Sequence, residues 1–366
     1  MSRSAMKDTG TPPVDRELFD PDRLSRWMDD RGLPGGRIGD VRPVTGGTQN
    51  VLVRFERGGQ EYVLRRPPRH KRPNSDETMR REAQLLTALA GTDVPHPRLI
   101  AACDTTDVIG AAFYLMEPVE GVTPATELLA PLSQDPALQR ELGLSVIDSI
   151  AALSRVDPRA VPYYDASRAE GWLTRQVGRW SAQLSSYEKY DGYPGFAPDT
   201  VERVTAWLND HQPRISEIGV IHGDFHLANV IVRPDTGTVA AIVDWELAAI
   251  GDPLLDLGHL LATWPVDGNP VSASLSVPGL PSRDDLVEHY ATRTGRDLDA
   301  LTWFRVLACY RLAVVLEGTH ARAGAGQAPA DMGARLHTMA QALIDQADGL
   351  IRRPTSPTSP FSGEAP

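Results

Sequence analysis

The chain has little of what marks secreted, membrane-embedded or nucleic-acid-binding proteins. Its 366 residues include two cysteines, Cys103 and Cys309, which lie far apart without metal-ligand spacing and favour a reduced, cytoplasmic setting. Residues 1–13 lack the apolar core of a signal peptide, and the longest apolar run, residues 306–316, is interrupted by Arg311 and too short to cross a bilayer. A net charge of −11 argues against general nucleic-acid binding. We therefore expect a cytoplasmic protein without nucleic-acid or membrane partners, and the oligomeric state stays open.

The sequence also lacks the P-loop, G-x-x-x-x-G-K-[ST], with which many proteins hold the phosphates of ATP. A different route to phosphate chemistry is indicated by residues 222–229, His-Gly-Asp-Phe-His-Leu-Ala-Asn, and by Asp244, which ends an apolar segment fifteen residues after Asn229. The pattern H-x-D-x-x-x-x-N with a separate Asp is the spacing of a kinase catalytic loop and its metal-binding carboxylate.

This spacing suits the transfer of a phosphoryl group from ATP. A carboxylate must orient the acceptor hydroxyl and accept its proton, which predicts Asp224 as the catalytic residue. Mg²⁺ keeps waters and phosphate oxygens as ligands and needs few from the protein. One amide oxygen from Asn229 and one carboxylate from Asp244 are therefore a reasonable set of protein ligands. Residues 229–232 and 240–243 read as two short apolar strands around a turn, and a hairpin would return Asn229 and Asp244 to the same end.

The histidines of this loop allow more than one interpretation. His222, Asp224 and His226 could be three metal ligands on one strand face, as in a metal-dependent hydrolase, but this would leave Asn229 and Asp244 without a role. We expect His222 to hold the loop by hydrogen bonds. His226 occupies the position where many kinases place a Lys near the transferred phosphate, so it is a candidate nucleotide contact; the alternative is a solvated loop residue.

A kinase also needs a phosphate-covering turn and a cation upstream, and both have candidates. Gly46 and Gly47 lie between two predicted strands, where backbone amides could approach a phosphate, although an ordinary hairpin turn fits equally well. Arg65 on a predicted strand could pair with a phosphate or with Glu82, in the middle of a helix predicted at residues 75–89. Kinases normally carry Lys at this position, and an exposed Arg on an edge strand is the alternative.

The segment that would receive adenine is an apolar strand running into residues 117–121, Glu-Pro-Val-Glu-Gly. Backbone groups of Glu117 and Val119 could bond the edge of the base, while Pro118 has no N–H to offer and restricts flexibility. By itself this is an ordinary strand end. Its place between the helix of Glu82 and the loop of Asp224 supports the assignment.

Taken in order, these segments resemble the aminoglycoside phosphotransferase and choline kinase superfamily. More narrowly, residues 62–68, Tyr-Val-Leu-Arg-Arg-Pro-Pro, and residues 244–258, Asp-Trp-Glu-Leu-Ala-Ala-Ile-Gly-Asp-Pro-Leu-Leu-Asp-Leu-Gly, resemble the kinase-like domain that is fused, in some proteins, to an acyl-CoA dehydrogenase. In that subgroup Arg in place of the strand Lys is common. The resemblance covers about residues 35–350, nearly the whole chain.

The resemblance implies an α+β, protein-kinase-like bilobal fold, with a small N-terminal antiparallel β lobe that carries one helix and a larger, mainly helical C-terminal lobe. It also implies ATP with Mg²⁺ as the donor and a small-molecule hydroxyl as the acceptor. The roles carried over by position are those of a base (Asp224), of metal ligands (Asn229, Asp244) and of groups that organise the phosphates (Arg65, Glu82). Asp256 matches a position that usually braces the catalytic loop.

The length of the chain is consistent with two lobes and leaves no room for an attached dehydrogenase. The expected divisions are a disordered tail (1–13), an N-terminal helix with the β-rich nucleotide-binding lobe (14–118), the helical lobe with the catalytic loop and acceptor site (119–352) and a second disordered tail (353–366). Asp135-Pro136 and Asp252-Pro253 predict two helix starts, because Asp is a favoured N-cap and Pro suits the first helical position.

The acceptor pocket is expected to be built largely by residues 155–214. This segment has eight basic and eight acidic residues, a balance that does not suit a polycationic aminoglycoside. Its aromatic residues indicate either an acceptor with apolar surface or a helix-packing core. We expect a small-molecule kinase, with a hydroxyacyl compound as the preferred acceptor. The alternatives are an antibiotic phosphotransferase and a catalytically silent nucleotide-binding module; a protein kinase is disfavoured because the activation segment ending in Ala-Pro-Glu is missing.

Overall fold

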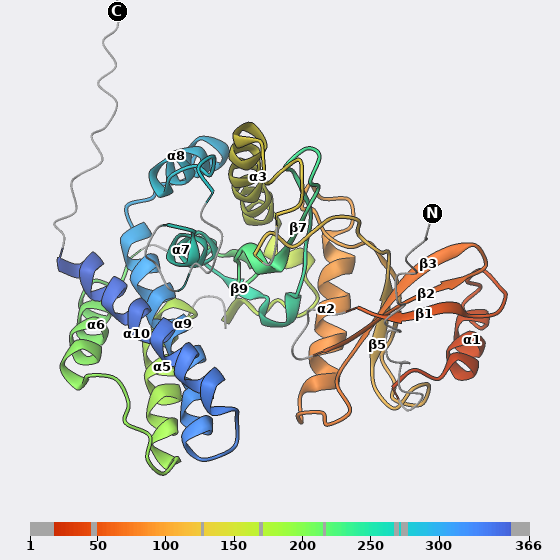
Figure 1. Cartoon of the computed structure of the whole chain (residues 1–366), viewed down its shortest axis with the longest axis horizontal. Helices are drawn as coiled ribbons and strands as arrows, with labels where there is room; N and C mark the ends of the chain where they lie inside the picture. The colour runs from red at the N-terminus through yellow and green to blue at the C-terminus, as the bar shows by residue number, and fades with distance from the viewer. Residues whose placement is uncertain are drawn as a thin grey trace, which may run out of the picture.

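The computed structural model consists of a strand-rich N-terminal region followed by a mainly helical remainder (Figure 1). The residues that the structure describes are 18–44, 50–125, 128–167, 171–214, 217–266, 271 and 277–352. The expected tails at residues 1–13 and 353–366 lie outside these ranges, as do Gly46 and Gly47.

A five-stranded antiparallel sheet forms the N-terminal region. Its strands, in the spatial order β1-β2-β3-β5-β4, are β1 (Gly39–Pro43), β2 (Val51–Arg57), β3 (Gln60–Arg66), β5 (Phe113–Met116) and β4 (Leu99–Cys103). Strand β3 lies in the centre, paired with β2 on one side and β5 on the other. Arg65 is therefore on a central strand and buried, so the alternative of an exposed edge-strand Arg is wrong.

Two helices pack on opposite faces of this sheet. Helix α1 (Pro21–Asp29) shares a core with Phe113 and Leu115, whereas helix α2 (Ser75–Leu89) shares a core with Tyr114. The division follows from the alternation of side chains along β5, which sends successive residues to opposite faces. Helix α2 begins and ends where the sequence pattern predicts.

The remainder of the described chain is mainly helical. Its α-helices are α3 (Pro136–Ser154), α5 (Gln176–Ser185), α6 (Pro198–Asp210), α7 (Leu254–Thr263), α8 (Arg283–Thr294), α9 (Leu301–Gly324) and α10 (Ala330–Arg352). Two small antiparallel sheets pair β6 (Gly219–Ile221) with β9 (Ala249–Gly251) and β7 (Val230–Val232) with β8 (Val239–Ile242). Short 3₁₀ turns lie at Pro158–Ala160, Leu173–Arg175, Ser186–Lys189, Leu227–Asn229 and Trp245–Leu247.

The two helix starts predicted from Asp-Pro pairs have different outcomes. Asp135 caps α3 as expected, with its side chain accepting from the backbone N–H of Ala137 and Pro136 in the first helical position. Helix α7 begins at Leu254, one residue later than expected, and Pro253 precedes it. The Asp252 carboxylate still accepts a hydrogen bond from the N–H of Leu254 (2.9 Å), so it satisfies one of the free N–H groups at this end.

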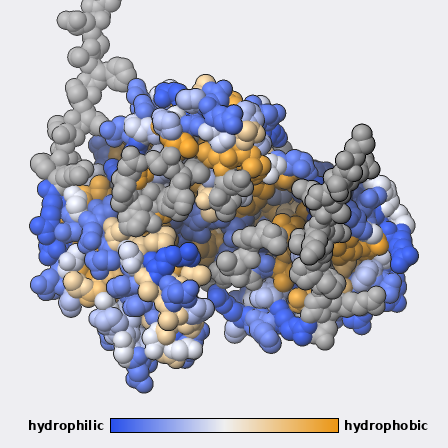
Figure 2. Space-filling model, viewed as in Figure 1, coloured by the Kyte–Doolittle hydropathy of each residue, from blue (hydrophilic) through white to orange (hydrophobic). Residues whose placement is uncertain are grey.

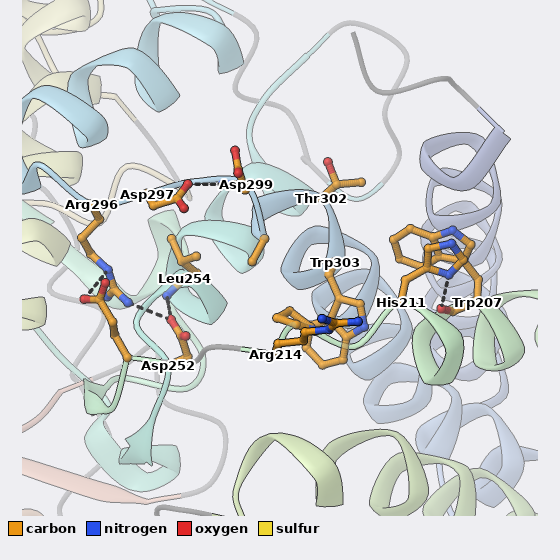
Figure 3. A pocket seen from close by; sticks show the side chains of 13 residues that line it. Trp207, His211, Arg214, Asp252, Leu254, Arg296, Asp297, Asp299, Thr302 and Trp303 are labelled. Carbon is orange, nitrogen blue, oxygen red and sulfur yellow. Dashed lines mark hydrogen bonds and ion pairs between the residues drawn. The ribbon is translucent and has the colours of Figure 1, made fainter. Parts of the chain in front are cut away.

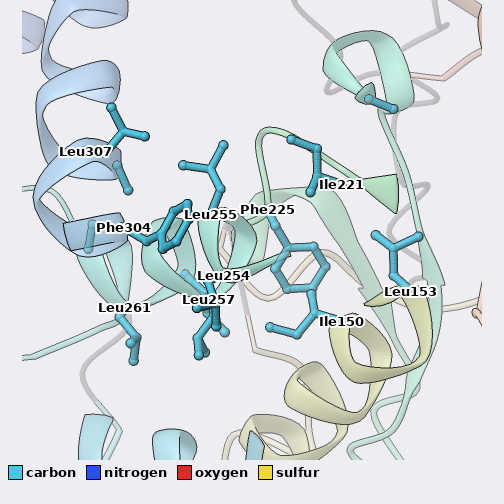
Figure 4. Packing of buried hydrophobic residues seen from close by; sticks show 14 of the residues in the cluster. Ile150, Leu153, Ile221, Phe225, Leu254, Leu255, Leu257, Leu261, Phe304 and Leu307 are labelled. Carbon is cyan, nitrogen blue, oxygen red and sulfur yellow. The ribbon is translucent and has the colours of Figure 1, made fainter. Parts of the chain in front are cut away.

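The larger core surrounds the loop that contains Asp224. Phe225, the next residue, is completely buried and packs between Ile150 of α3 and the leucines of α7 (Figure 4). The same core takes in the inner side of α2, including Leu86, so this helix joins the sheet region to the helical region. We propose residues 14–118 and 119–352 as the limits of the two lobes, with α2 packed against both.

The face seen in Figure 2 is hydrophilic around much of its rim, while hydrophobic residues gather toward the middle of the view. Among the described residues, the helices are either too short or too polar to span a membrane.

Candidate active site

Asp256 of α7 fixes the loop that contains Asp224. Its carboxylate oxygens accept hydrogen bonds from the backbone N–H groups of His222 (2.7 Å) and Gly223 (2.9 Å). Burial raises the pKa of Asp256, although His222 and the two N–H groups act in the opposite direction. Gly223 has a φ of +80°, and a Cβ atom there would collide with the carbonyl oxygen of Leu247, so the loop needs glycine at this point. Asp256 therefore occupies the bracing position that the resemblance implies.

His222 holds the loop through both ring nitrogens. Its Nδ1 accepts a hydrogen bond from the backbone N–H of Asp224 (3.3 Å), which places the proton of the neutral ring on Nε2. Nε2 in turn lies 2.9 Å from the carbonyl oxygen of Val243, to which it donates. Since both nitrogens are occupied and the ring is buried, His222 has no lone pair for a metal ion. This geometry argues against the hydrolase interpretation with three metal ligands.

Asp224 lies between two imidazole rings. Its Oδ2 is 3.6 Å from Nε2 of His226, and its Oδ1 is 3.5 Å from Nε2 of His259 on α7. His226 accepts from the N–H of Ala228 through Nδ1, so its Nε2 carries the proton that faces Asp224. Burial raises the pKa of Asp224, but His226, His259 and His222 outweigh it and hold this pKa well below the usual range. The carboxylate is therefore ionised at neutral pH.

The hairpin of β7 and β8 brings Asn229 and Asp244 to the same end, as the sequence predicts. The N–H of Val243, the residue before Asp244, donates to the carbonyl oxygen of Asn229 (2.9 Å). The Asn229 side chain donates through Nδ2 to the backbone oxygen of Asp224 (2.9 Å), which turns Oδ1 the other way. Oδ1 accepts no hydrogen bond from the described residues.

Asp244 has a left-handed backbone conformation, with φ +65° and ψ +61°. Such a conformation costs free energy for a residue other than glycine and is often found at functional sites. One carboxylate oxygen, Oδ1, accepts from Nη2 of Arg65 at 2.6 Å, while Oδ2 has no hydrogen-bond partner in the described part of the chain. Two residues later, Glu246 accepts a hydrogen bond from Asn50 (3.1 Å), which follows the predicted phosphate-covering turn.

Arg65 joins the sheet, helix α2 and Asp244. Its Nε forms an ion pair with Glu82 at 2.9 Å, and Glu82 also accepts a hydrogen bond from the hydroxyl of Tyr114 (2.9 Å). Burial raises the pKa of Glu82 to about 7 against the opposing effects of Arg65 and Tyr114. For Arg65 burial acts to lower the pKa, but Glu82, Tyr114 and Asp244 outweigh it and raise that pKa, so the guanidinium stays charged. Its Nη1 makes no hydrogen bond or ion pair with a described residue.

In the predicted adenine segment, one of the candidate backbone groups is already paired. The N–H of Glu117 donates to the carbonyl oxygen of Arg98 (3.0 Å), so this N–H is not available to a ligand. The carbonyl of Glu117 and the N–H of Val119 make no hydrogen bond to another described residue. The other predicted nucleotide contacts, Gly46 and Gly47, lie outside the described residues.

Two residues near Asp224, His259 and Arg311, were not predicted from the sequence as site residues. His259 is buried, and burial lowers its pKa to about 3, so the ring is neutral; neither of its nitrogens has a hydrogen-bond partner among the described residues. Arg311 of α9 is also buried, and its Nη1 has no partner there. The available signal was a polar side chain inside a largely apolar stretch: His259 within residues 254–262, which also contain Asp256, and Arg311 within residues 306–316.

A pocket of about 600 Å³ lies elsewhere, among residues of α6, α9 and the segment before α9 (Figure 3). Trp207, His211 and Trp303 contribute to its wall, and Arg296 pairs with Asp252 at 3.2 Å on another side. None of the predicted catalytic, metal-binding or nucleotide-binding residues lines this pocket, although Trp207, His211 and Arg214 belong to the segment expected to build the acceptor pocket. Its size alone does not connect it with the chemistry at Asp224.

The comparisons with known proteins decide the family. The model of the phosphotransferase enzyme family matches residues 40–304. The chain belongs to this family. A solved structure of a provisionally assigned aminoglycoside phosphotransferase from Ralstonia eutropha is 27% identical, with a TM-score of 0.74 over 90% of this chain and 98% of that one. The macrolide 2′-phosphotransferase MphH from Brachybacterium faecium, at 20% identity and a TM-score of 0.55 over 89% of this chain and 98% of that one, shares the fold.

Curated relatives carry the same segment within longer chains. Acyl-CoA dehydrogenase family member 11 of Gallus gallus is 29% identical over 363 residues, which are 94% of this chain and 45% of that protein. A probable acyl-CoA dehydrogenase of Arabidopsis thaliana is 30% identical over 361 residues, 92% of this chain and 43% of that protein. The chain thus spans less than half of these relatives. The predicted kinase-like fold and the resemblance to the phosphotransferase superfamily and its dehydrogenase-linked branch are confirmed.

Proposed function

We propose that this phosphotransferase moves the γ-phosphoryl group of ATP to a hydroxyl group of an anionic small molecule, with a hydroxyacyl compound as the preferred acceptor. The observation that carries the proposal is the grouping of Asp224, Asn229 and Asp244. The β7–β8 hairpin and the hydrogen bond from Asn229 to the Asp224 backbone bring them together, and Arg65 approaches from the sheet side.

The oxygen atoms left free at this point fit a hard divalent cation. Oδ1 of Asn229 and Oδ2 of Asp244 are oxygen donors without hydrogen-bond partners among the described residues, and Mg²⁺ typically takes one or two protein ligands in a nucleotide site. When bound, Mg²⁺ would neutralise charge on the phosphate oxygens. Arg65 holds Asp244 in place through Oδ1, and its remaining Nη1 is free to donate to a phosphate.

Asp224 would act on the acceptor. Its ionised carboxylate can accept a hydrogen bond from the acceptor hydroxyl and so aim the oxygen at the γ-phosphorus. A carboxylate with a lowered pKa is a weak base, so it orients the hydroxyl first. It takes the proton as the new P–O bond forms and the bond from the γ-phosphorus to the leaving ADP breaks. His226 and His259 limit the directions in which the carboxylate can turn.

The contacts to the adenine and the remaining contacts to ATP are proposed from the sequence-based assignment. We propose that the carbonyl of Glu117 and the N–H of Val119 bond the adenine, because both lie just after β5 and neither makes a hydrogen bond to a described residue. Gly46 and Gly47 are proposed to cover the phosphates. Glu82 would keep Arg65 oriented through their ion pair, and the His226 ring beside Asp224 would lie near the transferred phosphoryl group.

The chemistry around Arg311 favours an acceptor with negative charge. The guanidinium lies over the ring of Trp180, 5.2 Å from its centroid, and is close enough to Asp224 and Asp256 for their charges to oppose the lowering of its pKa by burial. It makes no hydrogen bond or ion pair with a described residue. Leaving a buried cation without a hydrogen-bond partner is costly. A carboxylate or phosphate on the acceptor would supply that partner, whereas a polycationic aminoglycoside would be repelled.

Replacing Arg311 by Gln is expected to raise the KM for an anionic acceptor by about 10-fold to 100-fold, the equivalent of one charged hydrogen bond. The KM for ATP should stay within about twofold, because Arg311 is assigned no nucleotide contact. Initial rates at varied acceptor and fixed ATP measure the effect. Arg179→Gln is the matched control, since Arg179 also lies over Trp180, at 5.1 Å, but is exposed. Equal changes in both variants would contradict the assignment.

An acceptor screen that follows Mg²⁺-dependent ADP release tests the proposed function. It should contain hydroxycarboxylates, hydroxyacyl-CoA compounds, aminoglycosides and macrolides. We expect turnover with a hydroxylated anion and none with an aminoglycoside. Efficient phosphorylation of an antibiotic alone would retain the reaction class and overturn the acceptor class. ATP binding without turnover of any compound would favour the catalytically silent module.

A further inference from the structure

Three side chains with metal-ligand chemistry meet between α9 and α10, and the proposed phosphotransfer chemistry uses none of them. We propose that Glu317, His320 and His337 form a binding site for Zn²⁺. The candidate ligand atoms of these three residues all lie within 4.8 Å of one another. The proposal concerns a second site and does not depend on the identity of the phosphate acceptor.

The helices explain why these residues meet. Glu317 and His320 are three positions apart on α9, so they lie on the same face, one turn from each other. His337 comes from α10, which packs along α9 (Figure 1). Gly333 makes this close packing possible, because a Cβ atom there would collide with the Cβ of Ala323 on α9.

The carboxylate of Glu317 is the anchor of the cluster. Its side chain is fully buried, and both of its oxygens lie near Nδ1 of His337, at 2.9 and 3.0 Å. A buried carboxylate requires a partner with positive charge or a hydrogen bond. The imidazole N–H now supplies it. Zn²⁺ would replace that proton, with the carboxylate and the ring nitrogen both as ligands.

The spacing of the ligands is near that of an occupied zinc site. Bonds of about 2.0–2.2 Å in a tetrahedral arrangement place neighbouring ligand atoms about 3.3–3.6 Å apart. To bind the ion, Nδ1 of His337 must move slightly away from the Glu317 oxygens, and the ligand nitrogen of His320 must approach both residues. The rings of His320 and His337 now stack with centroids 4.3 Å apart and planes inclined by 25°, so His320 has to turn to direct a nitrogen at the ion.

Tyr193 lies beside the cluster and can orient its carboxylate. Its hydroxyl is buried next to the Glu317 side chain, and its ring lies at the edge of His320, 6.3 Å between centroids. A protonated phenol beside a ligating carboxylate can donate to it and hold it in the orientation that the metal requires.

The ligand types select the metal. Two imidazoles and one carboxylate are typical of Zn²⁺ sites that keep a fourth position for water, whereas Mg²⁺ prefers oxygen donors alone. The side chain of His337 is 30% exposed and that of His320 is partly exposed, which gives the ion a path from solvent. Zn²⁺ bound here would fix α10 against the second half of α9, the helix that also carries Arg311.

The test is zinc binding by the full chain, measured as metal content after equilibration and gel filtration and as affinity in competition with a chelator. We expect about one Zn²⁺ per chain, in a site that vanishes in His320→Ala and in His337→Ala. Tyr193→Phe should weaken the affinity by about 10-fold to 100-fold and leave the stoichiometry unchanged. His211→Ala, which removes another ring-stacked histidine, and His226→Ala, which removes a ring beside Asp224, should keep the ion.

Co²⁺ reports the geometry of the site. Substituted into the wild type, it should give the strong visible absorption of a four-coordinate ion, and this absorption should be lost in the double variant of His320 and His337. Circular dichroism of each variant confirms that the helices are intact. Zinc content that is unchanged by the two histidine substitutions, or that falls in His226→Ala instead, would overturn the proposal, as would a wild type that binds no zinc.

Discussion

Asp224→Asn is expected to lower kcat by about 10³-fold, with little change in the KM for ATP. Asn has the size of Asp but cannot take the proton of the acceptor hydroxyl, and its amide is a weaker hydrogen-bond acceptor. The carboxylate contacts to His226 and His259, at 3.6 and 3.5 Å, would also change, since an amide can present an N–H to either ring. Acceptor-dependent ADP release measures kcat, and a thermal shift with ATP shows whether the nucleotide still binds.

Asp148→Asn is the matched control for this substitution. Asp148 also contacts a histidine, with 2.8 Å between its Oδ1 and Nε2 of His289, but it belongs to α3 and has no place in the proposed reaction. Its replacement should leave kcat unchanged. An Asp224→Asn enzyme that keeps more than about a tenth of the wild-type turnover would show that this carboxylate does not act on the acceptor.

Asp244→Ala is expected to abolish Mg²⁺-dependent turnover, a loss of about 10²-fold to 10³-fold or more. The substitution removes the free Oδ2 of Asp244. It also removes Oδ1, which accepts a hydrogen bond from Nη2 of Arg65 at 2.6 Å. Among the described residues, Glu82 then remains as the ion-pair partner of the guanidinium. The dependence of the rate on Mg²⁺ concentration should lose its saturation, because Asn229 remains as the single protein ligand. Initial rates over a Mg²⁺ series at fixed ATP provide the measurement.

Asp235→Ala tests whether any acidic residue of the β7–β8 hairpin has this effect. Asp235 lies exposed in the turn between these strands, whereas Asp244 follows β8. We expect its replacement to leave the Mg²⁺ dependence unchanged. If Asp244→Ala still shows saturable activation by Mg²⁺ with the wild-type midpoint, the metal is held elsewhere and the assignment of Asp244 fails.

The parts of the site that could be predicted from sequence depend on local patterns. Asn229 and Asp244 meet because two short apolar strands flank a turn, and a hairpin of this kind has one simple pairing. His222 could be assigned to the support of the loop because a buried imidazole needs hydrogen-bond partners. Helix α2 could be predicted within residues 75–89 because Met79, Ala83, Leu86 and Leu89 recur at helical spacing.

The parts that could not be predicted depend on contacts between distant elements. His259 reaches Asp224 from α7 and Arg311 reaches the same region from α9, and the packing of these helices against the loop is not encoded in any local pattern. The adenine segment shows a related limit. The sequence indicated that the backbone of Glu117 could bind adenine. In the structure its N–H donates to the carbonyl oxygen of Arg98, which belongs to a separate segment of the chain. The conformation of Asp244, with positive φ, was likewise not visible in the sequence.

A crystal structure with Mg²⁺ and a non-hydrolysable ATP analogue would show which side chains hold the metal ion. We expect the ion about 2.0–2.1 Å from Oδ1 of Asn229 and from a carboxylate oxygen of Asp244, with the terminal phosphate facing Asp224. A nucleotide bound away from Arg65, or a metal ion held by other side chains, would contradict this assignment.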